Sequence, residues 1–175
     1  MANRWAQEWG LVNLKQNPNL LKLRFETFLP DPILTNLENT QNITNELIQH
    51  LSNTTNMNLS QFTHETIFRT TKKGFKLNWH KDHYNPSINL KLSREQGKKI
   101  YHWNKCMQKI PKYTALIYFN NYGSDFKGGL LKMADNTIIT PKRGLTIFFD
   151  SEEVHCVTQQ TSGERKIVLI KFYNK

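Results

Sequence analysis

Residues 141–159 read Pro-Lys-Arg-Gly-Leu-Thr-Ile-Phe-Phe-Asp-Ser-Glu-Glu-Val-His-Cys-Val-Thr-Gln, and this stretch has the pattern that decides the fold. A short apolar run, Leu145–Phe149, is followed by an acidic turn, and a second run begins at His155. Short apolar runs bounded by turn residues are typical of β-strands, because helices usually extend over about ten or more residues. The stretch therefore predicts two strands, the second of which begins with an imidazole.

The same pattern extends outward from this stretch. From residue 61 onward, short apolar runs alternate with Gly, Pro, Asn or Asp. Eight such runs after a helical stretch predict an α+β protein whose larger part is a sandwich or barrel of the jelly-roll type. The expected strands are residues 66–71, 76–82, 113–120, 129–134, 137–139, 145–149, 155–159 and 166–173.

The N-terminal part has a different pattern of apolar and polar residues. Residues 21–29 alternate apolar and polar side chains, which predicts one more strand. Pro30 and Pro32 end this strand, and apolar residues then keep helical spacing through about residue 52. We expect a single domain over residues 1–175, which divides into an N-terminal arm (1–20), a strand with supporting helices (21–65) and a jelly-roll core (66–175) with a basic insertion at 86–112.

The composition excludes several classes of protein. Hydrophobic residues make up 38% of the 175 positions, enough to form a core, which excludes a disordered tail. Two cysteines are too few for a disulfide framework. The sequence has neither an apolar run of about 20 residues nor a secretory signal near its beginning. We therefore expect a soluble, cytoplasmic protein.

The positive charge is concentrated in one segment. Residues 69–112 contain twelve basic and two acidic residues, whereas the rest of the chain has twelve of each. Such a segment is either a solvated loop or a surface that attracts an acidic peptide or a nucleic acid. The charge alone leaves these alternatives open.

A candidate metal site begins at His80 and Asp82. In an extended strand these two side chains project to the same side, because side chains alternate along the strand. One imidazole and one carboxylate are two of the three ligands of the 2-His-1-carboxylate triad of non-heme Fe(II). His155 is the favoured third ligand because it begins a strand, where a sheet can hold it opposite the first two. The other histidines considered are His50, His64 and His102.

Arg165 is the second chemical signal. It opens the otherwise apolar run 166–173, and a guanidinium at such a position is costly to bury unless an anion meets it. Arginine binds a carboxylate through two parallel hydrogen bonds, which lysine does not. The alternative is an ordinary arginine at a strand end in water.

Taken together, these motifs resemble those of the Fe(II)- and 2-oxoglutarate-dependent dioxygenases, in particular the prolyl 4-hydroxylase-like branch. The resemblance covers about residues 66–173, in the order and at the spacing of that family. It is carried by Trp79–Asp82, Tyr113–Asn120, Phe126–Leu130, Pro141–Ser151, His155 and Gly163–Arg165.

The resemblance implies a double-stranded β-helix and a set of roles. His80, Asp82 and His155 would bind Fe(II), and Arg165 and Tyr118 would contact 2-oxoglutarate. With dioxygen, and with ascorbate as reductant, the enzyme would hydroxylate a residue of a peptide or protein substrate, in the first place proline, and release succinate and carbon dioxide. The resemblance also places Gly128 and Gly129 beside the cofactor cavity.

Two alternatives to the peptide hydroxylase remain. The first is a 2-oxoglutarate-dependent oxygenase that acts on nucleic acid, bound through the basic segment 69–112. The second is a catalytically inactive basic binding module on the same scaffold. Succinate formation separates the second alternative from both enzymes, and the salt dependence of nucleic-acid binding helps to separate the two enzymes.

Overall fold

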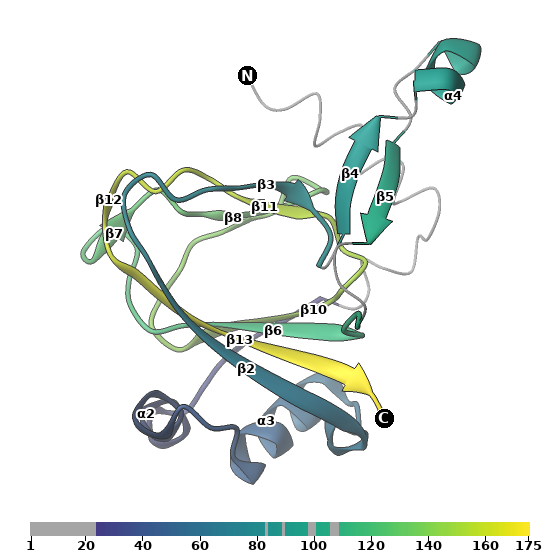
Figure 1. The fold of residues 1–175 in the computed structure, drawn as a ribbon. Coiled ribbons are helices and arrows are strands. Elements are labelled where there is room, and N and C mark those ends of the chain that lie inside the picture. Colours follow the sequence, from purple (N-terminus) through teal and green to yellow (C-terminus); the bar gives the residue numbers. More distant parts are fainter. Residues whose placement is uncertain (1–23, 83, 89, 98–100, 106–108) are drawn as a thin grey trace.

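The computed structural model describes residues 24–82, 84–88, 90–97, 101–105 and 109–175. Two antiparallel sheets face each other, and helices cover the outer side of the larger sheet (Figure 1). This arrangement confirms the α+β class and the jelly-roll core. The predicted arm, residues 1–20, lies outside the described residues.

The larger sheet has the strand order β1-β10-β6-β13-β2. Its central strands are buried along their whole length because one side faces the second sheet and the other faces the helices. Every strand that the sequence predicted for this sheet is present. Its strands are β1 (Phe25–Phe28), β2 (Phe62–Thr71), β6 (Tyr113–Tyr118), β10 (Leu145–Asp150) and β13 (Arg165–Asn174).

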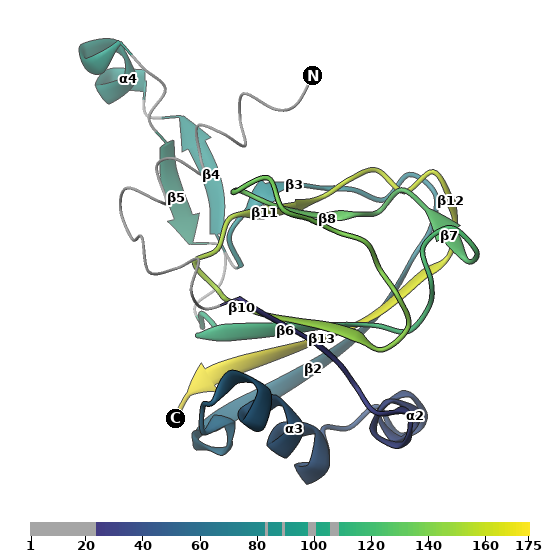
Figure 2. The same ribbon diagram turned by 180° about the vertical axis from the view of Figure 1, so that it is seen from behind.

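The smaller sheet has the order β3-β11-β8-β9. It faces the larger sheet, as the view from behind also shows (Figure 2). Its strands are β3 (Leu77–His80), β8 (Leu131–Met133), β9 (Ile138–Ile139) and β11 (His155–Val157). A short ladder of β7 (Phe126–Lys127) and β12 (Ser162–Gly163) lies at one end of the barrel (Figure 1).

Two helices support the larger sheet, as the sequence predicted, and the second ends at Thr55, a little beyond the expected end near residue 52. Helix α2 (Asp31–Thr40) ends at Gln41, whose φ of 57° is left-handed, and helix α3 (Asn45–Thr55) begins after Thr44. The Thr44 side chain accepts a hydrogen bond from the Leu47 N–H and so caps the second helix. Both helices bury apolar residues in the same core, which is why the helical spacing continues across the break between them. A short 3₁₀ helix (Leu59–Gln61) leads into β2.

Two apolar cores flank the larger sheet. The outer core packs the helices against the sheet, through residues such as Leu37, Leu51 and Phe172. The inner core lies between the sheets and includes Ile147 and Phe149. Polar side chains that project between the two sheets are therefore surrounded by this inner core.

The insertion forms a hairpin that projects from the barrel (Figure 1). It consists of β4 (Tyr84–Ile88) and β5 (Tyr101–Lys105), with α4 (Leu90–Gln96) between them. The sequence predicted an insertion here but neither of its two strands. Within the described ranges, no helix is both long and apolar enough to cross a bilayer.

Candidate active site

His80, Asp82 and His155 meet at one end of the barrel. His80 ends β3 and His155 begins β11, and the two are direct partners in the antiparallel ladder. Asp82 follows His80 by two residues, so one candidate ligand atom from each side chain lies within 4.8 Å of the others. The ladder thus brings together groups that are 75 positions apart in the sequence.

Both imidazoles are oriented by backbone carbonyls. The Nδ1 of His80 lies 2.6 Å from the Asn78 oxygen, and the Nδ1 of His155 lies 2.8 Å from the Glu153 oxygen. A carbonyl only accepts hydrogen bonds, so each Nδ1 carries the proton and each Nε2 keeps its lone pair. Burial, with the charge of His80, lowers the pKa of His155 to about 3 despite the opposing effect of Asp82. His155 is therefore neutral near pH 7 and suited to bind a metal.

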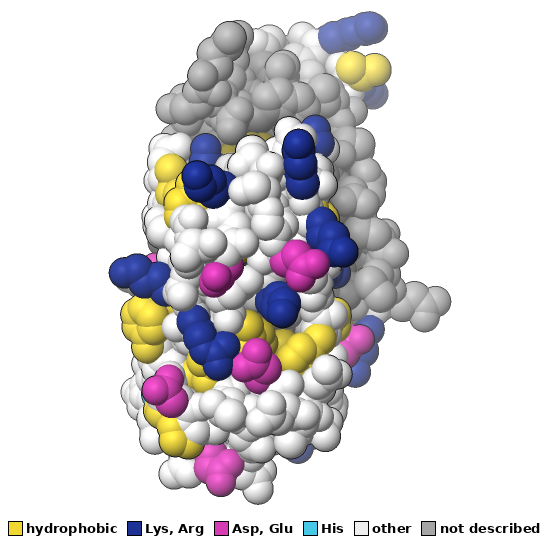
Figure 3. All heavy atoms as spheres, turned by 90° about the vertical axis from the view of Figure 1, so that its left-hand side faces the viewer, with side chains coloured by type: hydrophobic (Ala, Val, Ile, Leu, Met, Phe, Trp, Pro, Cys, Tyr) yellow, Lys and Arg dark blue, Asp and Glu magenta, His cyan; other side chains and the backbone are white. Residues whose placement is uncertain are grey.

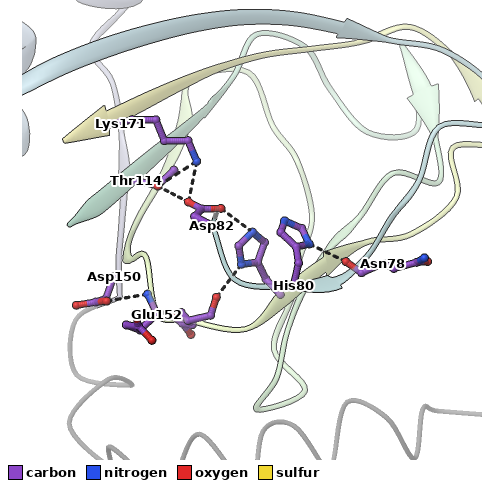
Figure 4. A network of polar contacts seen from close by, with 9 residues as sticks. Asn78, His80, Asp82, Thr114, Asp150, Glu152 and Lys171 are labelled. Atoms are coloured by element: carbon purple, nitrogen blue, oxygen red, sulfur yellow. Dashed lines mark hydrogen bonds and ion pairs between the residues drawn. The ribbon is translucent and has the colours of Figure 1, made fainter. Parts of the chain in front are cut away.

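Asp82 is held through one of its two oxygens. The Lys171 ammonium donates to Oδ2 at 2.7 Å, and the Thr114 hydroxyl donates to the same oxygen (Figure 4). The other oxygen, Oδ1, lies 3.5 Å from the Nε2 of His155. Burial alone would raise the pKa of Asp82, but Lys171 and His155 outweigh it and hold the pKa well below its usual range. An ionised carboxylate thus presents Oδ1 toward the two bare nitrogens.

The turn before His155 is itself fixed. The Glu152 N–H donates to the Asp150 carboxylate at 2.8 Å, which closes a local turn after β10 (Figure 4). The Glu152 carboxylate accepts a hydrogen bond from Lys81 at 2.7 Å. Lys81 lies between His80 and Asp82 in the sequence, so this ion pair connects the segment that carries these two ligands to the turn before His155.

A cavity of about 350 Å³ opens beside these groups. Its wall is mostly apolar, with Leu116 and Phe149 from the larger sheet and Leu131 and Val157 from the smaller one. Arg165 lines the same cavity and is 1% exposed. A metal at the triad and an anion at Arg165 would therefore share one largely apolar cavity.

Arg165 and Tyr118 carry polar atoms without protein partners. The Nε of Arg165 and the hydroxyl of Tyr118 are buried and make no hydrogen bond to any residue that the structure describes. The guanidinium lies 5.5 Å from the centre of the Tyr118 ring, and burial raises the pKa of Tyr118, so the hydroxyl stays protonated. Because unpaired buried groups are costly, this pair fits a carboxylate ligand that would accept from both.

The two glycines leave room beside Arg165. A Cβ on Gly129 would lie 3.1 Å from the Cδ of Arg165, and a Cβ on Gly128 would lie 2.1 Å from the Gln159 carbonyl oxygen. Both residues also have positive φ, 70° and 64° for Gly128 and Gly129. Side chains here would displace the guanidinium or its supporting loop.

The other histidines considered do not join the triad. His50 contacts the Thr27 hydroxyl at 3.1 Å, and His64 lies against the Leu59 carbonyl. The side chain of His102 is outside the part of the structure that is described. Sequence reasoning missed Lys171 and Thr114, although a lysine in phase with Arg165, Ile167 and Leu169 on the inner face of β13 was a signal that could have been used.

Comparison with known proteins agrees with this geometry. The "2OG-Fe(II) oxygenase superfamily" matches residues 66–174. A curated relative in Xenopus tropicalis, "2-oxoglutarate and iron-dependent oxygenase domain-containing protein 3", is 28% identical over 98 residues, which are 50% of this chain and 31% of the relative. The match thus spans about a third of that relative's length.

Solved structures share the fold at low identity. The viral collagen prolyl hydroxylase of Paramecium bursaria Chlorella virus-1, in a complex with 2OG, is 16% identical with a TM-score of 0.51, covering 97% of this chain and 90% of that one. A prolyl-4-hydroxylase of Pseudomonas putida is also 16% identical, with a TM-score of 0.50 and coverage of 97% and 82%. At this identity the likeness supports the jelly-roll architecture.

Proposed function

The chain belongs to the 2OG-Fe(II) oxygenase superfamily, and on that premise we propose that it hydroxylates a peptidyl residue, in the first place proline. Enzymes of this superfamily use Fe(II), 2-oxoglutarate and dioxygen. One observation carries the proposal: a buried arginine, whose Nε has no hydrogen-bond partner among the described residues, opens on the same cavity as two imidazoles and a carboxylate.

The metal ligands in this proposal are Nε2 of His80, Nε2 of His155 and Oδ1 of Asp82. Their donor set is that of the 2-His-1-carboxylate triad, which suits Fe(II) and leaves positions open on the metal. Bound Fe(II) supplies the oxidation in which 2-oxoglutarate, dioxygen and a substrate C–H become succinate, carbon dioxide and C–OH. The protein orients the ligands and excludes water from the cavity.

Arg165 and Tyr118 bind the distal carboxylate of 2-oxoglutarate in the same proposal. The guanidinium supplies two parallel hydrogen bonds, and the hydroxyl supplies a third. The Nε of Arg165 and the hydroxyl of Tyr118 are buried without a hydrogen-bond partner among the described residues, so a carboxylate ligand would satisfy them. The apolar wall strengthens these charge-assisted hydrogen bonds because it lowers the local dielectric.

The experiment that tests this function measures succinate. Purified protein is given Fe(II), 2-oxoglutarate and ascorbate in air, and succinate is quantified with and without candidate peptides. His155→Ala should reduce succinate to background, whereas His64→Ala, at an exposed histidine outside the triad, should retain it. Full 2-oxoglutarate turnover by the His155 variant would rule out this triad.

Proline is tested by a peptide panel. Matched peptides with proline, alanine or lysine at one position are incubated with the enzyme, and mass spectrometry measures the gain of one oxygen atom. We expect the gain on the proline peptides. The solved structures of similar fold named above include prolyl hydroxylases, which is the reason to begin with proline.

A nucleic-acid substrate is the second candidate. The net charge of residues 69–112 favours it, and the hairpin within this segment follows directly after β3, the strand that ends at His80. At the opposite end of the barrel, lysines and arginines are mixed with acidic side chains, so that face has no patch of purely positive charge (Figure 3). Oligonucleotide binding that weakens steeply with salt, together with oxygen gain on a base, would favour this candidate.

A further inference from the structure

The cavity wall contains more positive charge than the proposed chemistry uses. Three cationic side chains, Arg69, Arg165 and Lys171, line it, against the single carboxylate of Asp82. Lys171 is paired with Asp82. Arg165 has a role in the proposed function, but Arg69 has none.

Arg69 faces the interior because of its place on β2. Ile67 and Arg69 line the cavity, while Phe68 between them packs against the outer core, as strand alternation requires. In the ladder Arg69 is the partner of Ile167, two residues along β13 from Arg165. The backbone of Arg69 therefore lies about 7 Å from that of Arg165 when measured along the strand direction, and it is displaced toward Lys171.

No described residue forms a hydrogen bond or an ion pair with the side chain of Arg69. The residue is nevertheless partly buried, and its cavity neighbours on the two adjacent strands, Ile67, Ile167 and Leu169, are apolar. A guanidinium in such surroundings is stabilised by an anion, and its planar fork matches a carboxylate. The position is therefore suited to bind an acidic group that enters the cavity.

The cofactors do not neutralise this excess. The charge of Fe(II) is balanced by the two carboxylates of 2-oxoglutarate, and Asp82 balances Lys171. Arg165 and Arg69 then leave the loaded cavity with two net positive charges. An anionic substrate would meet a favourable potential there, and a cationic one would be repelled.

From this we infer that the substrate carries a carboxylate close to the residue that is hydroxylated, and that Arg69 binds it. This inference rests on the proposed function, since it assigns Arg165 to 2-oxoglutarate. The carboxylate is either the side chain of Asp or Glu or the free C-terminus of a peptide. Arg69 thus determines specificity for an acidic peptide.

The test uses matched proline peptides. One pair differs only by Glu against Gln beside the proline, and a second pair has a free or an amidated C-terminus. Calorimetry measures their binding to the Fe(II)- and 2-oxoglutarate-loaded protein without oxygen, and succinate formation then measures kcat/KM in air. We expect the acidic member of one pair to bind about tenfold more tightly or better, because hydrogen bonds to charged groups are worth more than neutral ones.

Substitutions at Arg69 give the decisive readout. Arg69→Gln should abolish the preference for the acidic peptide, and Arg69→Glu should shift it toward a peptide with Lys at the same place. Lys166→Gln, which removes an exposed cation from β13, is the matched control and should keep the preference of the unaltered protein. Equal binding of acidic and neutral peptides by the unaltered protein would overturn the inference.

The affinity for 2-oxoglutarate separates the two arginines. Arg165→Gln should weaken 2-oxoglutarate binding, whereas Arg69→Gln should leave it within about twofold of the unaltered protein, a change of under 0.5 kcal/mol. An equal loss in both variants would assign Arg69 to the cosubstrate and overturn the inference. A preference that depends on Arg69 but comes without any succinate would refute the proposed oxygenase activity and leave the acidic-peptide site standing.

Discussion

The two ends of the cavity differ in how their polar groups are satisfied. At the metal end, the Nδ1 atoms of His80 and His155 and the Oδ2 of Asp82 all have protein partners. At the other end, the Tyr118 hydroxyl and the Arg165 Nε have none among the residues described. The metal end is organised by the protein, whereas the other end is left for a ligand to complete.

Because of this difference, we expect the metal end to contribute mainly to the stability of the fold and the other end mainly to the affinity for a ligand. A substitution at the metal end breaks contacts that exist in the folded protein, so it should lower the free energy of unfolding. A substitution at the unpaired end removes groups that make no protein hydrogen bond, so it should weaken ligand binding with little loss of stability. The predictions below test this division.

The largest effect is expected for Asp82→Ala. The substitution removes a metal ligand and leaves Lys171 buried without its counter-ion, which should cost about 3–5 kcal/mol of unfolding free energy and reduce turnover to background. Urea denaturation and succinate formation measure the two effects. The double variant Asp82→Ala with Lys171→Met should regain most of the stability but none of the turnover. A single variant as stable as the unaltered protein would contradict the role of this ion pair.

Arg165→Met tests the opposite end. Loss of a buried charge-assisted pair should weaken 2-oxoglutarate binding by about a hundredfold, measured by anaerobic titration. The protein without ligand should unfold at the same urea concentration as before, or a higher one, because an unpaired buried charge has been removed. Arg165→Lys keeps the charge and should show an intermediate affinity. A marked loss of stability in Arg165→Met would contradict the division between the two ends.

The sequence revealed the parts of this arrangement that depend on local patterns. The strands of the two facing sheets are short apolar runs between breaking residues, so periodicity was enough to locate them. His80 and Asp82 share a side because of strand alternation, and His155 could be suspected because it starts a run. Their pairing in the ladder could only be expected from a family resemblance.

Contacts between residues that lie far apart in the sequence could not be predicted from local patterns. Lys171 meets Asp82 across 89 positions, and no local pattern specifies such a pair. The β4–β5 hairpin, Tyr84–Ile88 paired with Tyr101–Lys105, was missed because both strands are short and β4 contains a proline, which argues against a strand.

Lys171→Met should have a smaller effect than the loss of Asp82. Thr114 still donates to Oδ2, so we expect a loss of about 1.5–3 kcal/mol, the usual worth of one hydrogen bond to a charged group. Added Mn(II) should restore part of the stability because the metal replaces the missing positive charge near Asp82. The visible spectrum of the Co(II)-loaded variant should also change, since the Asp82 carboxylate would be held by Thr114 alone and less firmly positioned.

Lys166→Met is the matched control for Lys171→Met. Lys166 lies on the same strand but is exposed, so its loss should alter neither the stability nor the Co(II) spectrum. Identical spectra for the unaltered and the Lys171→Met proteins would show that Lys171 does not position Asp82.

Tyr118→Phe should give the smallest effect and the cleanest separation of the two ends. The hydroxyl has no partner among the described residues, so its removal should leave the free energy of unfolding unchanged or slightly raised. The affinity for 2-oxoglutarate should fall by about twofold to tenfold, the worth of one hydrogen bond. Tyr173→Phe is the matched control, because the Tyr173 hydroxyl donates to Glu65 at 2.8 Å. That variant should lose stability and keep its affinity for 2-oxoglutarate, whereas the same behaviour in Tyr118→Phe would mean that the Tyr118 hydroxyl serves the fold rather than the ligand.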